Sequence, residues 1–116
     1  MQLAIEKQGS FLRIIVGGRL SSAVADGFQD ELMKELDAKP TVVLVDFTRL
    51  TFIASTGLRA LIVAAKRGQL IHLCGLNPSV QEVFDVSGLL RLFVVHPTTE
   101  EAMTALAADR EAAVEG

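Results

Sequence analysis

The residues best placed to do chemistry are Ser55 and Thr56, which follow an apolar run and open an amphipathic segment. Backbone N–H groups at the start of a helix lack partners, and the helix dipole is positive there. Such a position suits an anion, so a serine there can carry a phosphate. It equally suits a helix N-cap, in which the Ser55 hydroxyl accepts a hydrogen bond from the backbone. The position alone leaves both interpretations open.

Three other chemistries find little support. A hydrolase nucleophile elbow requires Gly two residues before and after the serine; Gly57 matches, but Ile53 does not. Asp46 ends an apolar run, as a phospho-acceptor aspartate would, yet residues 14–17 supply no acidic partner for a divalent cation. His72 and His96 lie in separate segments, and no cluster has metal-ligand spacing. We therefore expect no catalytic residue, no metal and no cofactor.

The composition of the chain narrows the range of possible ligands and cellular locations. With 116 residues, half of them hydrophobic, the chain can bury one core as a single domain. It has no Trp or Tyr and a net charge of −3 without a basic stripe, which argues against nucleic acid as a ligand. A single cysteine, Cys74, lies in an apolar run and fits a reducing cytoplasm. The N-terminal residues lack a signal-peptide pattern and the apolar runs are only strand-length, so we expect no membrane insertion.

Alternating strands and helices are expected to position Ser55. A polar link joins Asp46 to Ser55, and Gly17-Gly18 is expected to break the second strand. The apolar periodicity and the cap residues predict the following elements. Strands are expected at residues 2–7, 11–16, 41–45, 70–74 and 92–95. Helices are expected from Ser21 or Ser22 to Lys39, from Gly57 to Gly68, from Asn77 to about Ser87 and from Thr98 through Leu106.

The expected order is therefore ββαβαβαβα. This order predicts an α/β domain with a mixed four- to five-stranded sheet, largely parallel and covered by about four helices. We expect the domain to span residues 1–110 and the tail 111–116 to fray.

Residues 46–58 resemble the signature of STAS domains, and the closest branch is that of the bacterial anti-sigma-factor antagonists. In that signature an Asp, any residue and a Ser or Thr precede a short hydrophobic stretch, and Asp-Ser-Ser/Thr-Gly-Leu follows. Asp46 and Thr48 match the beginning of the pattern, and Ser55-Thr56-Gly57-Leu58 matches its end.

A second resemblance lies well away from the first. Residues 77–89, which include Gly88, are similar to the family's Pro-x-Val…Phe-x-x-Ser/Thr-Gly-Leu segment, and Gly18-Arg19-Leu20 resembles its Gly-x-Leu. The expected element order also agrees with the STAS fold, so the resemblance covers nearly the whole chain.

The resemblance implies a regulatory protein-interaction module rather than an enzyme. Unphosphorylated antagonists of this family bind an anti-sigma factor, a serine kinase with a histidine-kinase-like fold, and so release the sigma factor. The kinase phosphorylates the antagonist on a serine that maps to Ser55, and a PP2C-type phosphatase removes the phosphate. The implied partner-binding residues are Ser21, Ala54, Ser55, Thr56, Gly57 and Arg59, and the implied structural residues are Asp46, Thr48, Gly57 and Gly88.

Two positions depart from the family pattern. Ala54 stands where the family has an Asp, and Ser21 stands where an acidic residue commonly follows Gly-x-Leu. Both changes remove negative charge beside Ser55. They leave open a STAS module that is never phosphorylated, either the adaptor subunit of a lipid-transport ATP-binding-cassette complex or a stressosome-like scaffold. For the antagonist itself we expect a cytoplasmic monomer or weak dimer.

Overall fold

The structure is a computed structural model that describes residues 1–115. Strands and helices follow one another along this part of the chain. The strands are β1 Gln2–Gln8, β2 Phe11–Leu20, β3 Val42–Asp46, β4 Leu50–Ile53, β5 Ile71–Cys74 and β6 Val94–His96. The helices are α1 Ser22–Asp37, α2 Ser55–Ala65, α3 Pro78–Ser87, α4 Thr99–Ala105 and α5 Ala107–Glu115, with a 3-10 turn η1 at Leu89–Leu92.

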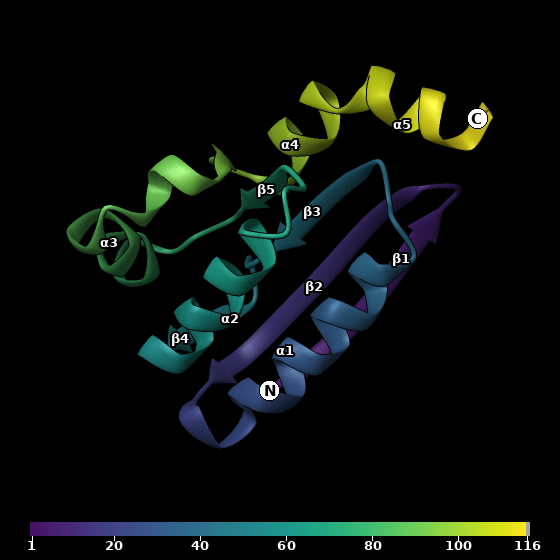
Figure 1. The fold of residues 1–116 in the computed structure, drawn as a ribbon. Helices are drawn as coiled ribbons and strands as arrows, with labels where there is room; N and C mark the ends of the chain where they lie inside the picture. The colour runs from purple at the N-terminus through teal and green to yellow at the C-terminus, as the bar shows by residue number, and fades with distance from the viewer. Residues whose placement is uncertain (116) are drawn as a thin grey trace.

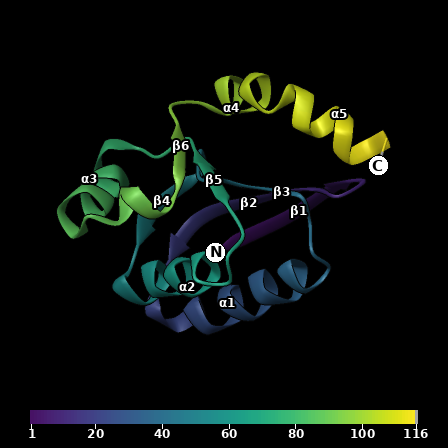
Figure 2. The same ribbon diagram turned by 45° about the horizontal axis from the view of Figure 1, so that its top comes forward.

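The strands form one mixed sheet in the order β1-β2-β3-β5-β6. β1 and β2 are antiparallel, and the remaining pairs are parallel. α1 and α2 lie side by side on one face of the sheet, and α4 and α5 cross the other face (Figures 1 and 2). The expected α/β fold and its ββαβαβαβα order are confirmed, and the structure adds one strand, β4, and one helix, α5, after the expected last helix.

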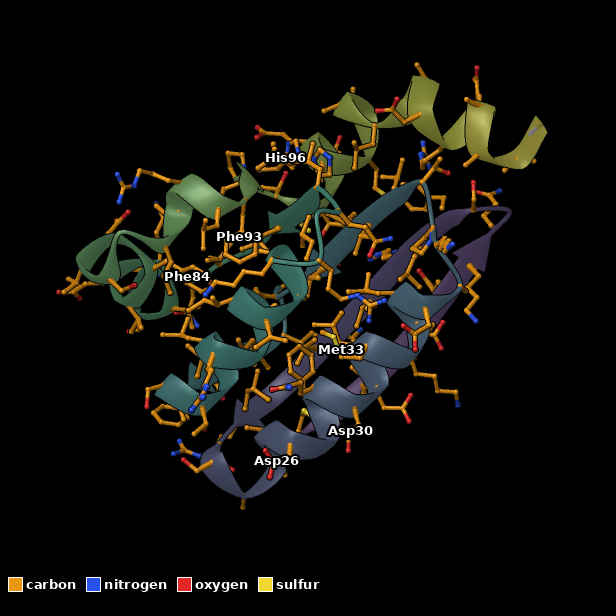
Figure 3. All side chains as sticks on the ribbon, viewed as in Figure 1. Asp26, Asp30, Met33, Phe84, Phe93 and His96 are labelled. Carbon is orange, nitrogen blue, oxygen red and sulfur yellow. The ribbon has the colours of Figure 1, made fainter. Side chains whose placement is uncertain are left out.

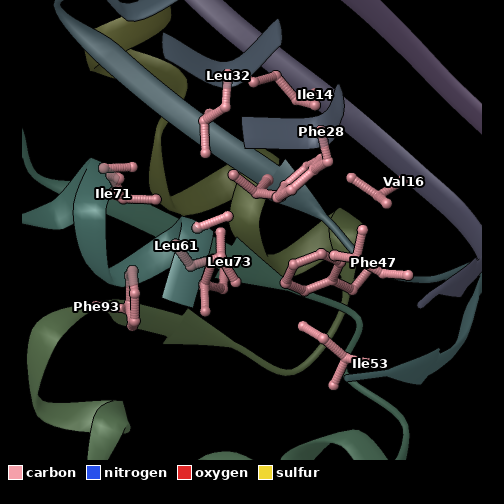
Figure 4. Packing of buried hydrophobic residues seen from close by; sticks show 14 of the residues in the cluster. Ile14, Val16, Phe28, Leu32, Phe47, Ile53, Leu61, Ile71, Leu73 and Phe93 are labelled. Carbon is pink, nitrogen blue, oxygen red and sulfur yellow. The ribbon is translucent and has the colours of Figure 1, made fainter. Parts of the chain in front are cut away.

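The main core fills the space between α1, α2 and the sheet. Phe28 and Leu32 project from α1 at helical spacing and Leu61 projects from α2, each with at most 1% exposure. They pack against Phe47 and the strand residues shown in Figure 4. Phe84 of α3 meets Phe93 edge to face, with ring centroids 6.0 Å apart (Figure 3). These contacts fix the helices on the sheet.

The segment between Asp46 and Ser55 is more than a polar link, because it contains β4. β4 pairs in parallel with the last residues of β2, and the register shifts between Gly18 and Arg19. The expectation that Gly17-Gly18 breaks the second strand is therefore wrong. Gly18 adopts a positive φ of 76°, which a glycine tolerates, and its N–H bonds the Arg49 carbonyl at 2.9 Å. The bulge lets β2 exchange one parallel neighbour, β3, for another, β4.

The C-terminal third also differs in its boundaries. The last strand begins at Val94 instead of residue 92, because η1 occupies the preceding residues. Residues 111–115, most of the expected tail, continue α5, where Ala113 is 5% exposed and its carbonyl accepts from Ser10 N–H at 3.3 Å. Gly116 lies outside the described residues. Over residues 1–115, no helix has both the length and the apolar character needed to cross a membrane.

Candidate partner-binding site

The parallel pairing of β2 with β4 delivers two helix N-termini to the same edge of the sheet. The final register pair is Leu20 with Ile53, and Ala54 N–H donates to the Leu20 carbonyl at 2.9 Å. α1 follows β2 and α2 follows β4, so both helices start beside this pair. A hydrogen bond of 3.3 Å from Thr56 Oγ1 to Ser22 Oγ joins the two first turns.

Ser55 is the first residue of α2, and Ala54 holds the N-cap position with extended backbone angles, φ −82° and ψ 162°. The interpretation of Ser55 as the N-cap is therefore wrong. Its side chain is exposed, and within residues 1–115 its hydroxyl has no hydrogen-bond partner. The amides of Ser55 and Thr56 likewise have no acceptor in the described part of the chain, since the first intrahelical bond comes from Gly57 N–H to Ala54. The edge thus presents a free hydroxyl beside free N–H groups.

Gly57 supports this edge from beneath and is itself buried. A Cβ at this position would lie 2.8 Å from Leu20 Cγ and 3.1 Å from Ile53 Cγ1. Only a glycine lets the first turn of α2 pack this closely on the ends of β2 and β4.

The remaining predicted site residues flank Ser55. Ser21 is the half-buried N-cap of α1, and its side chain makes no capping bond. Arg59 is exposed one helical turn after Ser55. The first turns of α1 and α2 contain no acidic residue. Ser21, Ala54, Ser55, Thr56 and Arg59 therefore belong to one edge, whose first helical turns carry no negative side chain.

Asp46 is a structural residue at the end of β3. Asp46 is 2% exposed. Its carboxylate accepts hydrogen bonds from Thr48 N–H at 2.9 Å and from Thr48 Oγ1 at 2.6 Å. Arg13 Nη2 donates at 2.8 Å and Thr99 Oγ1 at 2.9 Å. Burial acts to raise the pKa of Asp46, but the bonds from Thr48 and Arg13 outweigh it and the pKa is lowered. The carboxylate joins β2, β3 and α4 and is satisfied by its own fold, so it has no free lone pairs for a metal or a phosphoryl group.

Comparison with known proteins decides the family. The family model of the STAS domain matches residues 2–102. The chain belongs to the STAS domain family.

Among its relatives is BtrV of Bordetella bronchiseptica, whose name describes it as an anti-sigma factor antagonist. It is 36% identical over 110 residues, which cover 90% of this STAS domain protein and 94% of BtrV. An anti-sigma factor antagonist from Mycobacterium paratuberculosis superimposes with a TM-score of 0.82 at 18% identity, covering 91% of this chain and 93% of that one. The Bacillus cell fate determinant SpoIIAA in its phosphorylated form gives 0.70 at 20% identity, covering 90% and 99%. These two structures share the fold.

The second motif of this STAS domain lies on α3. Gly88 ends the helix in the left-handed conformation with φ 72°, and its N–H bonds the Asp85 carbonyl at 3.1 Å. Asn77 caps the start of α3 by accepting from Val80 N–H and also donates to the Leu50 carbonyl at 2.9 Å. The motif therefore positions α3 against β4 and contributes no side chain to the Ser55 edge.

Sequence reasoning separated two histidines that the fold brings together. His72 Nδ1 and His96 Nε2 are 3.1 Å apart, and their ring centroids are 5.4 Å apart. The β5–β6 register, with His96 opposite Cys74, makes His72 and His96 diagonal neighbours. His96 is labelled beside α4 in Figure 3. The histidine contact could have been predicted only from the register between β5 and β6. Within residues 1–115 there is no group of three or more His, Cys, Asp or Glu that could hold a metal.

Proposed function

We propose that this STAS domain is a bacterial anti-sigma-factor antagonist without catalytic activity of its own. It binds an anti-sigma factor that is a serine kinase with a histidine-kinase-like fold, and so releases the sigma factor. The kinase phosphorylates Ser55 to end the interaction, and a PP2C-type phosphatase restores it. In this proposal the protein works in the cytoplasm as a monomer or weak dimer.

One observation carries the proposal. The motif serine, Ser55, is exposed on the first turn of α2, with its hydroxyl unused by the fold. A kinase can reach such a hydroxyl without unfolding the domain. The name of BtrV, a relative along nearly the whole chain, supports the antagonist role.

The gate follows from electrostatics. A phosphate on Ser55 adds nearly two negative charges at the centre of the edge formed by the starts of α1 and α2. Burying this group unpaired in a protein interface costs several kcal/mol, because it must lose its hydration. A loss of that size weakens binding by more than about 100-fold, which suffices for a switch.

The free domain can accept the same phosphate. Two helix N-termini point their free N–H groups toward this edge, and their dipoles favour an anion there. Arg59, four residues after Ser55, supplies a cation at helical spacing. We therefore expect phosphorylation to change the choice of partner while the fold stays the same. The phosphorylated form of SpoIIAA has the same fold as this chain, which supports that expectation.

The departures at Ala54 and Ser21 shape the proposal. Without a carboxylate at either position, a kinase must recognise this edge through other groups. They also favour a second candidate function, a constitutive STAS adaptor in a lipid-transport complex or in a stressosome-like scaffold.

The test is phosphopeptide mass spectrometry on the protein recovered from its native cells, with metal chelated at lysis to block the phosphatase. The expected result is a phosphate on Ser55 in some growth conditions and its absence in others. A strain with Thr56→Ala is the matched control and should retain the modification, whereas Ser55→Ala should abolish it. An unmodified protein in every condition would overturn the switch and favour the adaptor.

A further inference from the structure

Phe52 is the exception among the aromatic residues of this chain. It is 37% exposed at the end of β4, next to the Ser55 edge. The other five phenylalanines are at most 7% exposed: Phe11, Phe28, Phe47, Phe84 and Phe93. A large apolar side chain left in solvent beside a candidate interface is a common anchor for a protein partner.

Arg19 holds Phe52 in place. Its guanidinium carbon lies 4.2 Å from the centroid of the Phe52 ring, within the range of a cation–π contact. The two residues are direct partners in the β2–β4 register. The bulge between Gly18 and Arg19 sets this register, so the backbone pairing of β2 and β4 places the two residues opposite each other.

The Arg19–Phe52 pair directly precedes the phospho-acceptor edge. The next register pair is Leu20 with Ile53, after which come Ser21 on one chain segment and Ala54 on the other. Side chains alternate along a strand, so Arg19 and Phe52 project from the face opposite to the buried Leu20 and Ile53. A partner that covers Ser55 meets this pair where it extends around the ends of β2 and β4.

The two strands that hold the pair, and the helix that follows β4, carry no negative charge. β2, β4 and α2 contain no carboxylate at all. Arg19, Arg49 and Arg59 are exposed on or beside these elements, and the first carboxylate along α1 is Asp26, in its second turn (Figure 3). The chain as a whole has a net charge of −3, so this basic face is a local feature. Carboxylates on a partner would complement these three arginines.

We propose that Arg19 and Phe52 form a preorganised anchor for an anti-sigma factor whose contact surface has an apolar pocket rimmed by carboxylates. This inference rests on the proposed function and names the partner's chemistry. Arg and aromatic residues dominate interface energetics when they are buried at the centre. The cation–π contact fixes both side chains before binding, so less conformational entropy is lost on association. Ala54 and Ser21 fit the same scheme, because acidic groups there would oppose an acidic partner.

The test measures affinity for individually purified proteins of the same cell that carry a histidine-kinase-like ATPase domain. Arg19→Glu should weaken binding by at least about 30-fold and Phe52→Ala by about 10-fold, as expected for interface anchors. Arg19→Gln should give an intermediate loss with less disturbance of the strand. Lys66→Glu and Leu70→Ala are the matched controls, since both residues are exposed in the segment between the C-terminal end of α2 and β5. They should change the affinity by less than about threefold.

A charge-reversal experiment tests whether the partner presents a carboxylate to Arg19. Replacing the facing carboxylate of the partner by Lys should restore binding to Arg19→Glu and weaken binding to the wild type. Phe52→Leu keeps an apolar side chain in the strand. It replaces Phe52→Ala in the binding measurement if Phe52→Ala does not fold. If wild type binds but Arg19→Glu and the Phe52 variants match the controls, the anchor is wrong and the proposed function stands. If wild type binds none of these proteins, the proposed function fails and the anchor fails with it.

Discussion

At the residue scale, Gly57 decides how closely α2 approaches the ends of β2 and β4. In Gly57→Ala the new Cβ would lie 2.8 Å from Leu20 Cγ, and Leu20 is fully buried. We predict a loss of about 1–3 kcal/mol in the free energy of unfolding, because overpacking exceeds the gain in helix propensity. Urea denaturation measures the change.

Gly27→Ala is the control for this substitution. Gly27 lies inside α1, and a Cβ there meets nothing within 4 Å. This variant should gain about 0.5–1 kcal/mol, because Ala is the better helix former. If both variants were stabilised, the close approach at Gly57 would be refuted.

Asp46 is the second residue whose role can be measured. Asp46→Asn removes the charge that faces Arg13 at 2.8 Å, and we predict a loss of about 3 kcal/mol at pH 7, as for other broken buried pairs. The pKa of Asp46 is lowered in the folded protein, because the bonds from Thr48 and Arg13 outweigh the opposing effect of burial. Its contribution is therefore complete above the unfolded pKa of about 3.9 and disappears as the pH falls through the folded pKa.

The pH dependence separates this charge effect from simple damage to packing. The free energy of unfolding of the wild type should decrease below about pH 4 more steeply than that of Asp46→Asn. Urea denaturation at a series of acidic pH values provides the comparison. Parallel curves for the two proteins would mean that Asp46 is not ionised in the fold.

At the element scale, the His72–His96 contact links β5 to β6. The pKa of His72 is lowered, first by burial and then by the charge of His96, while Asp109 acts in the opposite direction. The unfolded chain thus binds a proton more readily than the folded one. The His72 contribution is complete above about pH 6.5, and stability decreases as the pH falls from there toward the folded pKa.

Two variants should move this pH dependence in opposite directions. His96→Gln removes the neighbouring charge, so the loss of stability between pH 7.5 and 5.5 should become smaller. Asp109→Asn removes the opposing carboxylate, so the loss should become larger. Urea denaturation at the two pH values measures both, and an NMR titration of His72 locates its pKa. Equal pH dependence in all three proteins would contradict the coupling.

The elements themselves differ in how far the sequence predicts them. Helices with a strong apolar stripe, such as α1 and α3, were predicted correctly, and the buried β3 was predicted from its β-branched run. β4 was missed because it has four residues and pairs only with the end of β2. Short strands are specified by the neighbour they meet and carry little periodicity of their own.

The same limit applies to the candidate site. The sequence identified Ser55 and its neighbours through the family motif, but local pattern could not show that α1 begins beside α2. That closeness depends on the β2–β4 pairing. The Arg19–Phe52 contact and the histidine pair depend on strand register in the same way. Propensity assigns a residue to an element, whereas register decides which side chains meet.

At the scale of the whole molecule, the domain separates support from recognition. α4 and α5 cross one face of the sheet (Figure 2). Asp46, which accepts from Thr99 of α4, and the paired histidines belong to that face. The edge where α1 and α2 begin holds Ser55, and its first turns are free of acidic residues. A phosphate added at that edge changes the surface that a partner meets and leaves the supporting contacts untouched.

The central claim is that a phosphate on Ser55 decides whether the anti-sigma factor binds. The most direct measurement is isothermal titration calorimetry of that kinase with the unmodified protein and with the protein phosphorylated on Ser55 alone. The account predicts that phosphorylation weakens binding by at least about 100-fold, equivalent to about 3 kcal/mol. Ser55→Ala should bind within about threefold of the unmodified protein, because a small exposed hydroxyl contributes little. Equal affinity of the phosphorylated and unmodified proteins would contradict the account.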